Sequence, residues 1–561
     1  MFAAAMGSQA AHAVSLDLGD PDLVLRWDNS LRYNLGIRAQ QQDPAILANS
    51  SYDNSDSKFK RGDIVVDRFD LLSESDLVYK RRSGARLSAA LWADLAYIGD
   101  SEMTADSSFV VPGVGNTSSA YPNQRYTAFV RRWNRGPSGE VLDAFVFAGF
   151  DAGTVPIDVK LGQHTIYWGE SLFTFVHGVS YAQGPIDLRK AAASPGTEAK
   201  ELFKPLPQLS ATAGLSDTLS VAGQYYFGWK PSAYPDGGTY FGSFDALSQG
   251  GGTYVLNPAQ AAATSAAIGV PVASVPFIPT FGGPRKVGDW GLMTRWSPAW
   301  LGGAAGLYVR RYTDKLPDFV LGGLQTEPLA AGVAIPTSLG LSYPRKRVTL
   351  VGASVSTVIA GVSVSAEVSH RSNTPVLAGG GTMVGAEPYG DTSHALANAV
   401  AYFGKTSLFD SASLTSEVTY SHLDKLRAHP ENFNSEAHAC QALAVRLGCA
   451  TASAWGLTAR FEPTWFQIFP GADFSLPVLW SAGIKGTSPV QFGGYEGVGN
   501  YSVGATLDVK ARYNLALAYN GSYDRHHDDS VNAFGQRQVG SLAGSAGWDR
   551  GWISLTFKTA F

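Results

Sequence analysis

The side chains with the most varied chemistry in this sequence lie in one connecting segment, residues 168–205. The segment mixes aromatic rings, charged groups and hydroxyls, and a connection this long in a compact fold usually has a purpose of its own. Such a mixture suits a surface that binds a ligand or narrows a passage; the alternative is an exposed lid without a ligand. The residues expected to bind a substrate or form a constriction are Trp168, Glu170, Ser171, Phe173, Phe175, Tyr181, Asp187, Arg189 and Lys190.

Ser171, paired with His164 or His177, could in principle form the nucleophile and base of a hydrolase. The sequence has no G-x-S-x-G elbow and no convincing order of serine, histidine and aspartate, so we expect no catalytic residue. The stretch Asp53–Asp56 could hold calcium, although acidic residues in a solvated loop are the commoner situation. We expect neither a metal nor a cofactor.

The two cysteines and the N-terminal residues indicate export. Ala11-His12-Ala13 fits a secretory cleavage site, although the basic segment that normally precedes one is missing. We therefore interpret residues 1–13 as the remnant of a signal peptide and residues 14–561 as one domain. In an exported protein Cys440 and Cys449 are expected to form a disulfide that closes one loop.

The elements that must position the segment 168–205 are strands, because polar and apolar residues alternate along much of the chain. In residues 362–371, 412–421 and 503–510 one face is apolar and the other is rich in Ser, Thr, Asp, Glu and Lys. A dry core cannot hold that many unpaired polar groups, whereas a water-filled lumen can. The pattern predicts an all-β, single-chain, antiparallel transmembrane β-barrel.

Short and long connections alternate between the predicted strands, as periplasmic turns and extracellular loops do in outer-membrane barrels. This pattern gives eighteen strands, with sixteen as the fallback because 125–150 is the weakest prediction. We expect the loop at 168–205 to fold into the lumen. The predicted strands are 22–39, 61–79, 85–98, 125–150, 154–167, 206–214, 218–230, 286–298, 302–313, 345–358, 360–371, 395–405, 408–423, 454–466, 470–485, 499–511, 513–525 and 549–561.

Charged residues follow one face of two of these strands, opposite apolar residues such as Phe69 and Leu161. A charge facing lipid would cost several kcal/mol near the middle of the bilayer, so these residues are expected to face the lumen. There they either set selectivity or pair with each other and brace the wall, and His164 is expected to be a satisfied lumen residue. This lumen charge ladder contains Arg68, Asp70, Glu74, Asp76, Asp158, Lys160 and His164.

Composition fits a large barrel better than a set of soluble domains. Only 16% of the 561 residues are charged, 12% are aromatic and the net charge of −4 gives no reason to expect nucleic acid. The chain ends on an alternating strand with Phe557 and Phe561, as in the signal that barrel-assembly machinery recognises. The other expected partners are outer-membrane lipid, a small-molecule cargo, and a periplasmic or inner-membrane transport partner.

Several motifs between residues 25 and 230 combine charged, aromatic and glycine residues. They are Leu31–Gly36, Phe59–Gly62, Asp67–Glu74, Ala90–Asp94, Leu142–Val146, Leu161–His164, Trp168–Ser171 and Tyr181–Lys190. Together they resemble the bacterial outer-membrane family catalogued as domain of unknown function 1302. The resemblance implies an outer-membrane barrel, often encoded near envelope lipid-handling proteins and exporters of the resistance-nodulation-division type, and it implies no settled reaction.

Three functions fit these features. The first is a channel or transporter for small hydrophobic or amphipathic molecules, favoured by two apolar loop segments, Ala261–Ile278 and Leu329–Pro336. If these segments only pack on each other, they carry no information about cargo. The second is an accessory or structural barrel of a trans-envelope lipid-transport or efflux system. The third, which the missing catalytic motifs disfavour, is an outer-membrane hydrolase.

Overall fold

A computed structural model gives the fold. It describes residues 14–98, 110–111, 115–116, 121, 124–256, 261–262, 265–266, 269, 272, 274–281, 283–284, 287–325, 335–440, 448–525, 529–531, 536–539 and 547–561.

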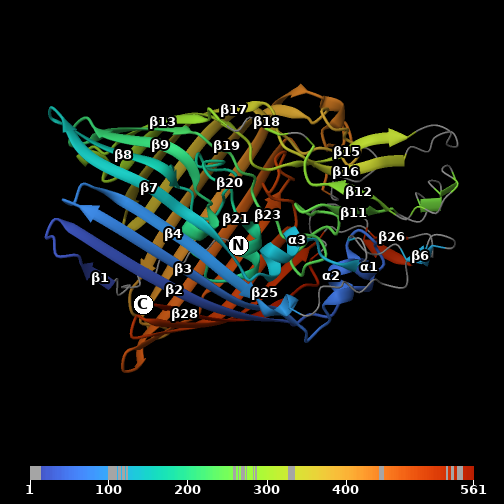
Figure 1. The fold of residues 1–561 in the computed structure, drawn as a ribbon, viewed down its shortest axis with the longest axis horizontal. Helices are drawn as coiled ribbons and strands as arrows, with labels where there is room; N and C mark the ends of the chain where they lie inside the picture. Colours follow the sequence, from blue (N-terminus) through green and yellow to red (C-terminus); the bar gives the residue numbers. More distant parts are fainter. Residues whose placement is uncertain are drawn as a thin grey trace.

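Antiparallel strands form one closed barrel that makes up most of the described chain (Figure 1). The sheet holds 20 strands, of which β1 (Val14–Asp17) only extends β2, and β22 and β23 are two parts of one wall strand, so the barrel has 18. The prediction of eighteen strands is therefore confirmed. The wall strands are β2 (Leu23–Arg38), β3 (Ile64–Tyr79), β4 (Ser83–Asp94), β7 (Ser138–Ala152), β8 (Val155–His164), β9 (Leu206–Gly214), β10 (Leu219–Tyr226), β13 (Trp290–Trp296), β14 (Ala304–Thr313), β17 (Arg347–Ile359), β18 (Val362–Pro375), β19 (Tyr389–Phe403), β20 (Ser411–Ala428), β21 (Ser453–Phe469), β22 (Ala472–Ser475), β23 (Val478–Lys485), β24 (Val498–Val509), β25 (Tyr513–Asp524) and β28 (Trp552–Ala560).

The barrel closes where the first wall strand meets the last. β2 pairs with β28 from Ser30 opposite Ala560 to Arg38 opposite Trp552, and β28 pairs with β25 on its other side. β1 occupies the edge of β2 that β28 leaves free, from Val14 opposite Trp27. Closure gives every wall strand a hydrogen-bonded neighbour on both sides, which a structure surrounded by lipid requires.

The two faces of the wall differ as alternation predicts. Leu307, Val351 and Val368 face outward and are 63%, 54% and 56% exposed, whereas Arg310 and Glu367 on the inner face are buried. A packed core therefore lies inside the lumen, where the loop that follows β8 meets β14 and β17. No helix in the described part of the chain is long and apolar enough to cross a membrane.

Short turns lie at one end of the barrel and long loops at the other, where small helices and sheets gather at the right of Figure 1. By the convention of outer-membrane barrels the short-turn end is periplasmic. The loop elements include a sheet in the order β11-β12-β16-β15. They are α1 (Pro44–Leu47), α2 (Asp53–Lys58), η1 (Leu95–Tyr97), β5 (Val110–Val111), β6 (Gly115–Asn116), α3 (Ala128–Val130), η4 (Arg131–Arg135), β11 (Gly252–Val255), β12 (Ser274–Ile278), β15 (Asp318–Gln325), β16 (Ile335–Ser342), η6 (Pro430–Asn432), β26 (Asp529–Val531) and β27 (Arg537–Val539), while η5 (Ala299–Leu301) forms a periplasmic turn.

Two local predictions differ from the structure. Only the second half of 125–150 is a strand, because the Thr127 hydroxyl accepts a hydrogen bond from the Val130 N–H and starts helix α3 instead. The apolar segment 261–278 contains strand β12, and its Val275 and Phe277 are buried against Leu339 and Leu341. Its described part thus packs on the neighbouring loop, the arrangement that carries no information about cargo. Most of segment 329–336 lies outside the described residues.

The expected disulfide is present between Cys440 and Cys449, whose Cα atoms are 5.8 Å apart in the loop that follows β20. The acidic stretch Asp53–Asp56 forms the first turn of α2. There Asp56 accepts hydrogen bonds from Arg38 at 2.8 Å and from Arg550 at 3.3 Å. The carboxylate is thus used to pair two arginines.

Candidate functional site: a loop across the lumen

The connection between β8 and β9 folds into the lumen, as predicted. We call residues 165–205 the lumen loop; it contains helices α4 (Leu188–Ala193) and α5 (Ala199–Leu202). Its polar groups bond to the inner faces of β2, β3, β28, β14, β18, β19 and β20. Because these strands lie on different sides of the barrel, the loop crosses the lumen.

The first attachment uses two wall carboxylates, and we call it the backbone anchor. Glu367 on β18 accepts hydrogen bonds from the N–H groups of residues 170, 171 and 179, with distances of 3.1 Å to Ser171 and 2.7 Å to Val179. Glu417 on β20 accepts from residues 172, 173 and 174 at 2.7, 3.1 and 2.7 Å. Six N–H groups of the loop are therefore held by two buried carboxylates.

Neighbouring wall residues bind the carbonyl groups of the same stretch. Arg310 on β14 donates to the carbonyls of Val179 and Tyr181, both at 2.7 Å. Arg371 on β18 donates to the Gly178 carbonyl at 2.9 Å, and Asn398 on β19 donates to that of Glu170 at 2.6 Å. The wall thus holds this stretch of the loop through backbone N–H and carbonyl groups.

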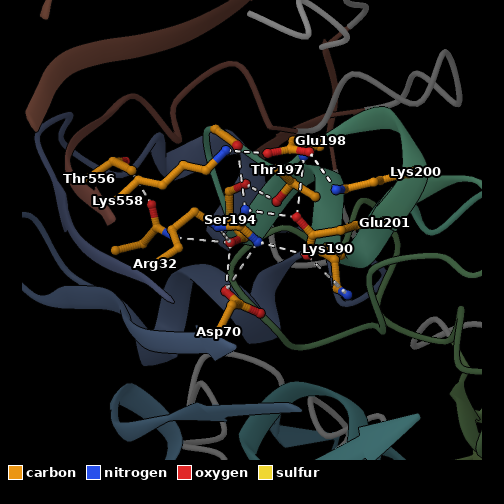
Figure 2. A network of polar contacts seen from close by, with 12 residues as sticks. Arg32, Asp70, Lys190, Ser194, Thr197, Glu198, Lys200, Glu201, Thr556 and Lys558 are labelled. Atoms are coloured by element: carbon orange, nitrogen blue, oxygen red, sulfur yellow. Dashed lines mark hydrogen bonds and ion pairs between the residues drawn. The ribbon is translucent and has the colours of Figure 1, made fainter. Parts of the chain in front are cut away.

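The second attachment uses loop side chains, and we call it the side-chain anchor (Figure 2). The Ser194 hydroxyl donates to Asp70 at 2.7 Å and accepts from Arg32 and Asn34, each at 2.9 Å. Arg32 also donates to both carboxylate oxygens of Glu201, at 3.0 and 3.2 Å. This bidentate geometry is the strong form of an ion pair, and every partner named here is buried.

Further ion pairs extend the side-chain anchor. Lys558 on β28 bonds Glu198, and Lys200 bonds Glu74 on β3 at 2.5 Å. Burial alone would raise the pKa of the Glu201 carboxyl, but Arg32 outweighs it and holds that pKa below its usual range. The carboxyl group of Asp187 behaves alike: burial opposes its charge, and Lys204 at 2.8 Å, with other cations, holds the pKa low. These groups are therefore paired as ions.

A cavity of about 850 Å³ lies between the lumen loop and the opposite wall. Its lining reaches Ser363, close to the periplasmic turn at Ala360–Gly361. The loop contributes Leu172, Phe173, Phe175, Leu202 and Phe203 as an apolar face. The wall contributes mostly small and uncharged polar residues, together with Val400, Pro477, Leu479, Tyr501 and Leu517; the small and polar ones are Ser363, Ser365, Asn398, Asn500, Ser502, Gly504, Thr506, Ala516, Ala518 and Asn520.

Charge is nearly absent from the cavity. Among the described residues that line it, Glu170, Lys200 and Arg460 carry a formal charge. Lys200 is paired with Glu74, and Arg460 with Glu462 at 2.7 Å. A charged ligand would find few free counter-ions here, whereas an uncharged amphipathic ligand finds aromatic and aliphatic side chains of the loop and many uncharged hydrogen-bonding side chains of the wall.

The predicted site residues separate into three places. Glu170, Ser171, Phe173 and Phe175 line the large cavity. Trp168 and Tyr181 belong to the core that packs against β14, and the Tyr181 hydroxyl donates to Asp314 at 2.7 Å. The remaining three, Asp187, Arg189 and Lys190, border a separate cavity of about 20 Å³. For all of the predicted site residues, a role in binding stays a prediction.

The lumen charge ladder pairs mainly with neighbouring residues. Arg68 bonds Asp70 at 2.9 Å, and Arg86 bonds both Glu74 and Asp76. These pairs give the bracing arrangement that the sequence allows, while a role in selectivity stays a prediction. Three members differ from these pairs. His164 bonds the Gly162 carbonyl at 3.0 Å and Ser210 at 2.8 Å. Asp158 and Lys160 are exposed.

The geometry around Ser171 is not that of a nucleophile with its base. Its hydroxyl donates to the Thr174 carbonyl. The ring of His177 contacts His394 at 3.1 Å and the Gly493 carbonyl at 3.0 Å, and burial lowers its pKa to about 4. His164 is engaged elsewhere, so neither histidine is placed to take the Ser171 proton.

Sequence reasoning missed the wall residues that hold the loop. Glu367 and Glu417 belong to the alternating segments 362–371 and 412–421, where each is the only carboxylate among serines and threonines. Such a lone carboxylate on a lumen face was an available signal. Its partner was not, because the Ser171 N–H that it accepts lies 196 residues away in sequence.

A closed antiparallel barrel with an apolar outer face and a polar lumen defines an integral β-barrel of the bacterial outer membrane. The family model described as "Protein of unknown function (DUF1302)" matches residues 1–561. The chain therefore belongs to that family.

No curated protein matches this chain. Acinetobacter baumannii OccAB4 is 8% identical with a TM-score of 0.40 over 96% of this chain and 98% of that chain. Pseudomonas aeruginosa OccK2 (OpdF) in complex with glucuronate is 9% identical with a TM-score of 0.39 over 96% and 97%. Pseudomonas aeruginosa OpdK with vanillate is 8% identical with a TM-score of 0.40 over 96% and 98%. Likeness at this level carries no argument about function.

Proposed function

We propose that this protein is an outer-membrane transporter for small, uncharged, amphipathic molecules, and that the large cavity is its binding chamber. The observation that carries the proposal is the composition of that cavity. Phe173, Phe175 and Phe203 supply an apolar face of about the size that buries a small organic ligand. Serine, threonine and asparagine side chains supply hydrogen bonds opposite them.

The loop's attachments give the chamber a fixed inner boundary. With the backbone anchor at β18–β20 and the side-chain anchor at β2–β3, the loop separates the cavity from the ion-paired residues around Asp187 and Arg189. Cargo at the apolar face would thus avoid the charged part of the lumen. A selective carrier with a bound ligand fits this arrangement better than a wide aqueous pore.

Extraction of ligands from the detergent-purified barrel, read by mass spectrometry, tests the proposal. Wild type should yield a defined neutral amphipathic species, and Phe173→Ala with Phe175→Ala should retain about tenfold less because both rings leave the apolar face. Phe150→Ala is the matched control, since Phe150 is 49% exposed on the outer surface. An empty wild-type barrel, or one loaded with a charged solute, contradicts the proposal.

A second candidate is an accessory barrel of a trans-envelope lipid-transport or efflux system. The lumen loop favours this candidate, because a loop bonded to two sides of the wall crosses the lumen, and an accessory barrel does not need a lumen that conducts solutes. Two experiments test this candidate: conductance of the purified barrel in planar bilayers, and co-purification of a periplasmic partner. A silent barrel that is also empty of ligand and bound to such a partner would favour this candidate over transport.

A further inference from the structure

One wall strand is interrupted beside the cavity. β22 ends at Ser475 and β23 begins at Val478, so residues 476 and 477 belong to neither, although β21 and β24 run unbroken on both sides. Position 477 is a proline, and Pro463 lies in β21 directly across from Leu476. Prolines are rare inside sheets because they lack the N–H that a ladder needs.

Both prolines fall at positions that should exchange two hydrogen bonds with the neighbouring strand. The Leu476 N–H donates to the Pro463 carbonyl at 3.0 Å, and the Gly504 N–H donates to the Pro477 carbonyl at 2.9 Å. In an antiparallel ladder such a pair normally exchanges a second bond in return. Neither proline can donate it, so the ladders on both sides of the interruption each lack one bond at the same height.

We call this interruption, formed by Pro463, Leu476 and Pro477, the proline seam. It lies within the membrane. Pro463 is six residues above Phe469 at the periplasmic turn. At about 3.3 Å per residue and a strand tilt of about 40°, that is roughly 15 Å above the turn, inside an apolar band about 25 Å tall. The outward side chains around the proline seam are apolar and lipid-facing, with Val478 40% and Val503 51% exposed.

The inner side of the proline seam is the cavity itself. Pro477 lines the cavity, and so do Leu479 on one side and Gly504 on the other. Gly504 packs closely against its neighbours here, because a Cβ placed on it would meet Ala518 at 3.2 Å and Pro477 at 3.6 Å. At this height the chamber and the lipid are therefore separated by a single layer of strands whose hydrogen-bond ladder is incomplete.

We propose that the proline seam is a lateral passage through which amphipathic cargo moves between the cavity and the hydrocarbon of the outer membrane. The inference rests on the proposed function, since it needs a ligand in the cavity. Parting β21 from β22–β23 at this height breaks fewer hydrogen bonds than parting any fully bonded pair of strands. A ligand with an apolar body would then reach lipid without crossing the ion-paired part of the lumen.

Pyrenebutanol, a neutral amphipathic fluorophore, tests the passage in the full-length barrel. The probe is loaded into barrels in nanodiscs whose lipids carry brominated chains, and its escape into lipid is followed as quenching by stopped flow. In Pro463→Val, at a residue that does not line the cavity, the missing N–H donor of the ladder between β21 and β22 is restored. Escape should slow about tenfold, while the amount of probe loaded at equilibrium changes little.

Pro156→Val is the matched control, because Pro156 also lies in a wall strand, β8, and away from the cavity. It should leave escape unchanged. Unchanged escape in the seam variant, with normal loading, would overturn the lateral passage and leave the proposed function intact. Failure of the wild-type barrel to load the probe would instead remove the proposed function and the passage with it.

A cross-link gives an independent test that does not depend on refilling the ladder. Thr464 and Ser475 are paired in register just below the prolines, so cysteines at both positions can join β21 to β22. Oxidation should stop escape into lipid, and reduction should restore it. Wild type treated alike controls for its own Cys440–Cys449 disulfide. Equal escape in the oxidised and reduced double-cysteine barrel would contradict the proposal.

Discussion

The two anchors of the lumen loop hold it by opposite means. At the backbone anchor the wall supplies the charge, through Glu367 and Glu417, and the loop supplies only backbone N–H groups. At the side-chain anchor the loop supplies the specific groups, among them Ser194 and Glu201, which meet Arg32 on the wall. One anchor therefore depends on the path of the loop and the other on its sequence.

This difference explains where the loop can carry a binding surface. Any residue except proline has an N–H for a wall carboxylate, so the side chains between 170 and 175 are free to face the cavity. Leu172, Phe173 and Phe175 do so. Around Ser194 and Glu201 the side chains are already committed to the wall. Specificity for a ligand should thus change at the backbone anchor without loss of the fold.

Removing both carboxylates should give the largest effect. In Glu367→Ala with Glu417→Ala, six N–H groups lose their acceptors, and each buried donor left unpaired costs about 1–3 kcal/mol. We expect the stretch 169–179 to leave the wall, with faster amide exchange there and higher conductance. Leu172→Ala keeps its N–H and should change neither. If amide exchange in the double variant stays at wild-type rates, the two carboxylates do not hold the loop, and the contrast between the anchors is wrong.

Arg32→Met should give the next largest effect, at the other anchor. It leaves the buried carboxylate of Glu201 without its guanidinium, a loss of about 3–5 kcal/mol for a broken buried pair, while Asp70 keeps its bonds to Arg68. The heat-induced gel shift of the folded barrel should move to lower temperature, and Glu201→Leu in the same chain should recover part of it. Amide exchange at 170–179 should stay as in wild type. Equal loosening at both anchors would show that they are not independent.

Lowering the pH should also distinguish the two anchors, with a smaller effect than either substitution. The pKa values of Glu201 and Glu198 are held low: burial would raise them, but Arg32 outweighs it at Glu201, and Lys558 with Lys200 at Glu198. A carboxyl group with a depressed folded pKa stabilises above its unfolded pKa, and that stability disappears as pH falls through the folded value. Amide exchange across 188–202, corrected for intrinsic rates, should therefore accelerate below pH ~4.5, about tenfold per pKa unit of depression. A flat profile would contradict this.

The barrel itself followed from the sequence, because alternation and the order of short and long connections are local properties. Segment 125–150 shows the limit, since a capped helical turn after Thr127 outcompeted the strand pattern there. The site could be predicted only in part. Loop residues such as Phe173 were visible as unusual chemistry in a long connection, but the separation of Trp168 from Phe175 depends on how the loop crosses the lumen.

The side-chain anchor also constrains the order in which the molecule can be built. It takes Arg32 from β2 and Lys558 from β28, the strands that meet when the barrel closes. The backbone anchor takes its carboxylates from β18 and β20, which lie within one uninterrupted run of hairpins. The loop can therefore dock on that run while the cylinder is still open. Within the side-chain anchor, the contact between Lys558 and Glu198 forms only as β28 reaches β2, so this pair acts as a clasp that fastens after the loop is already inside.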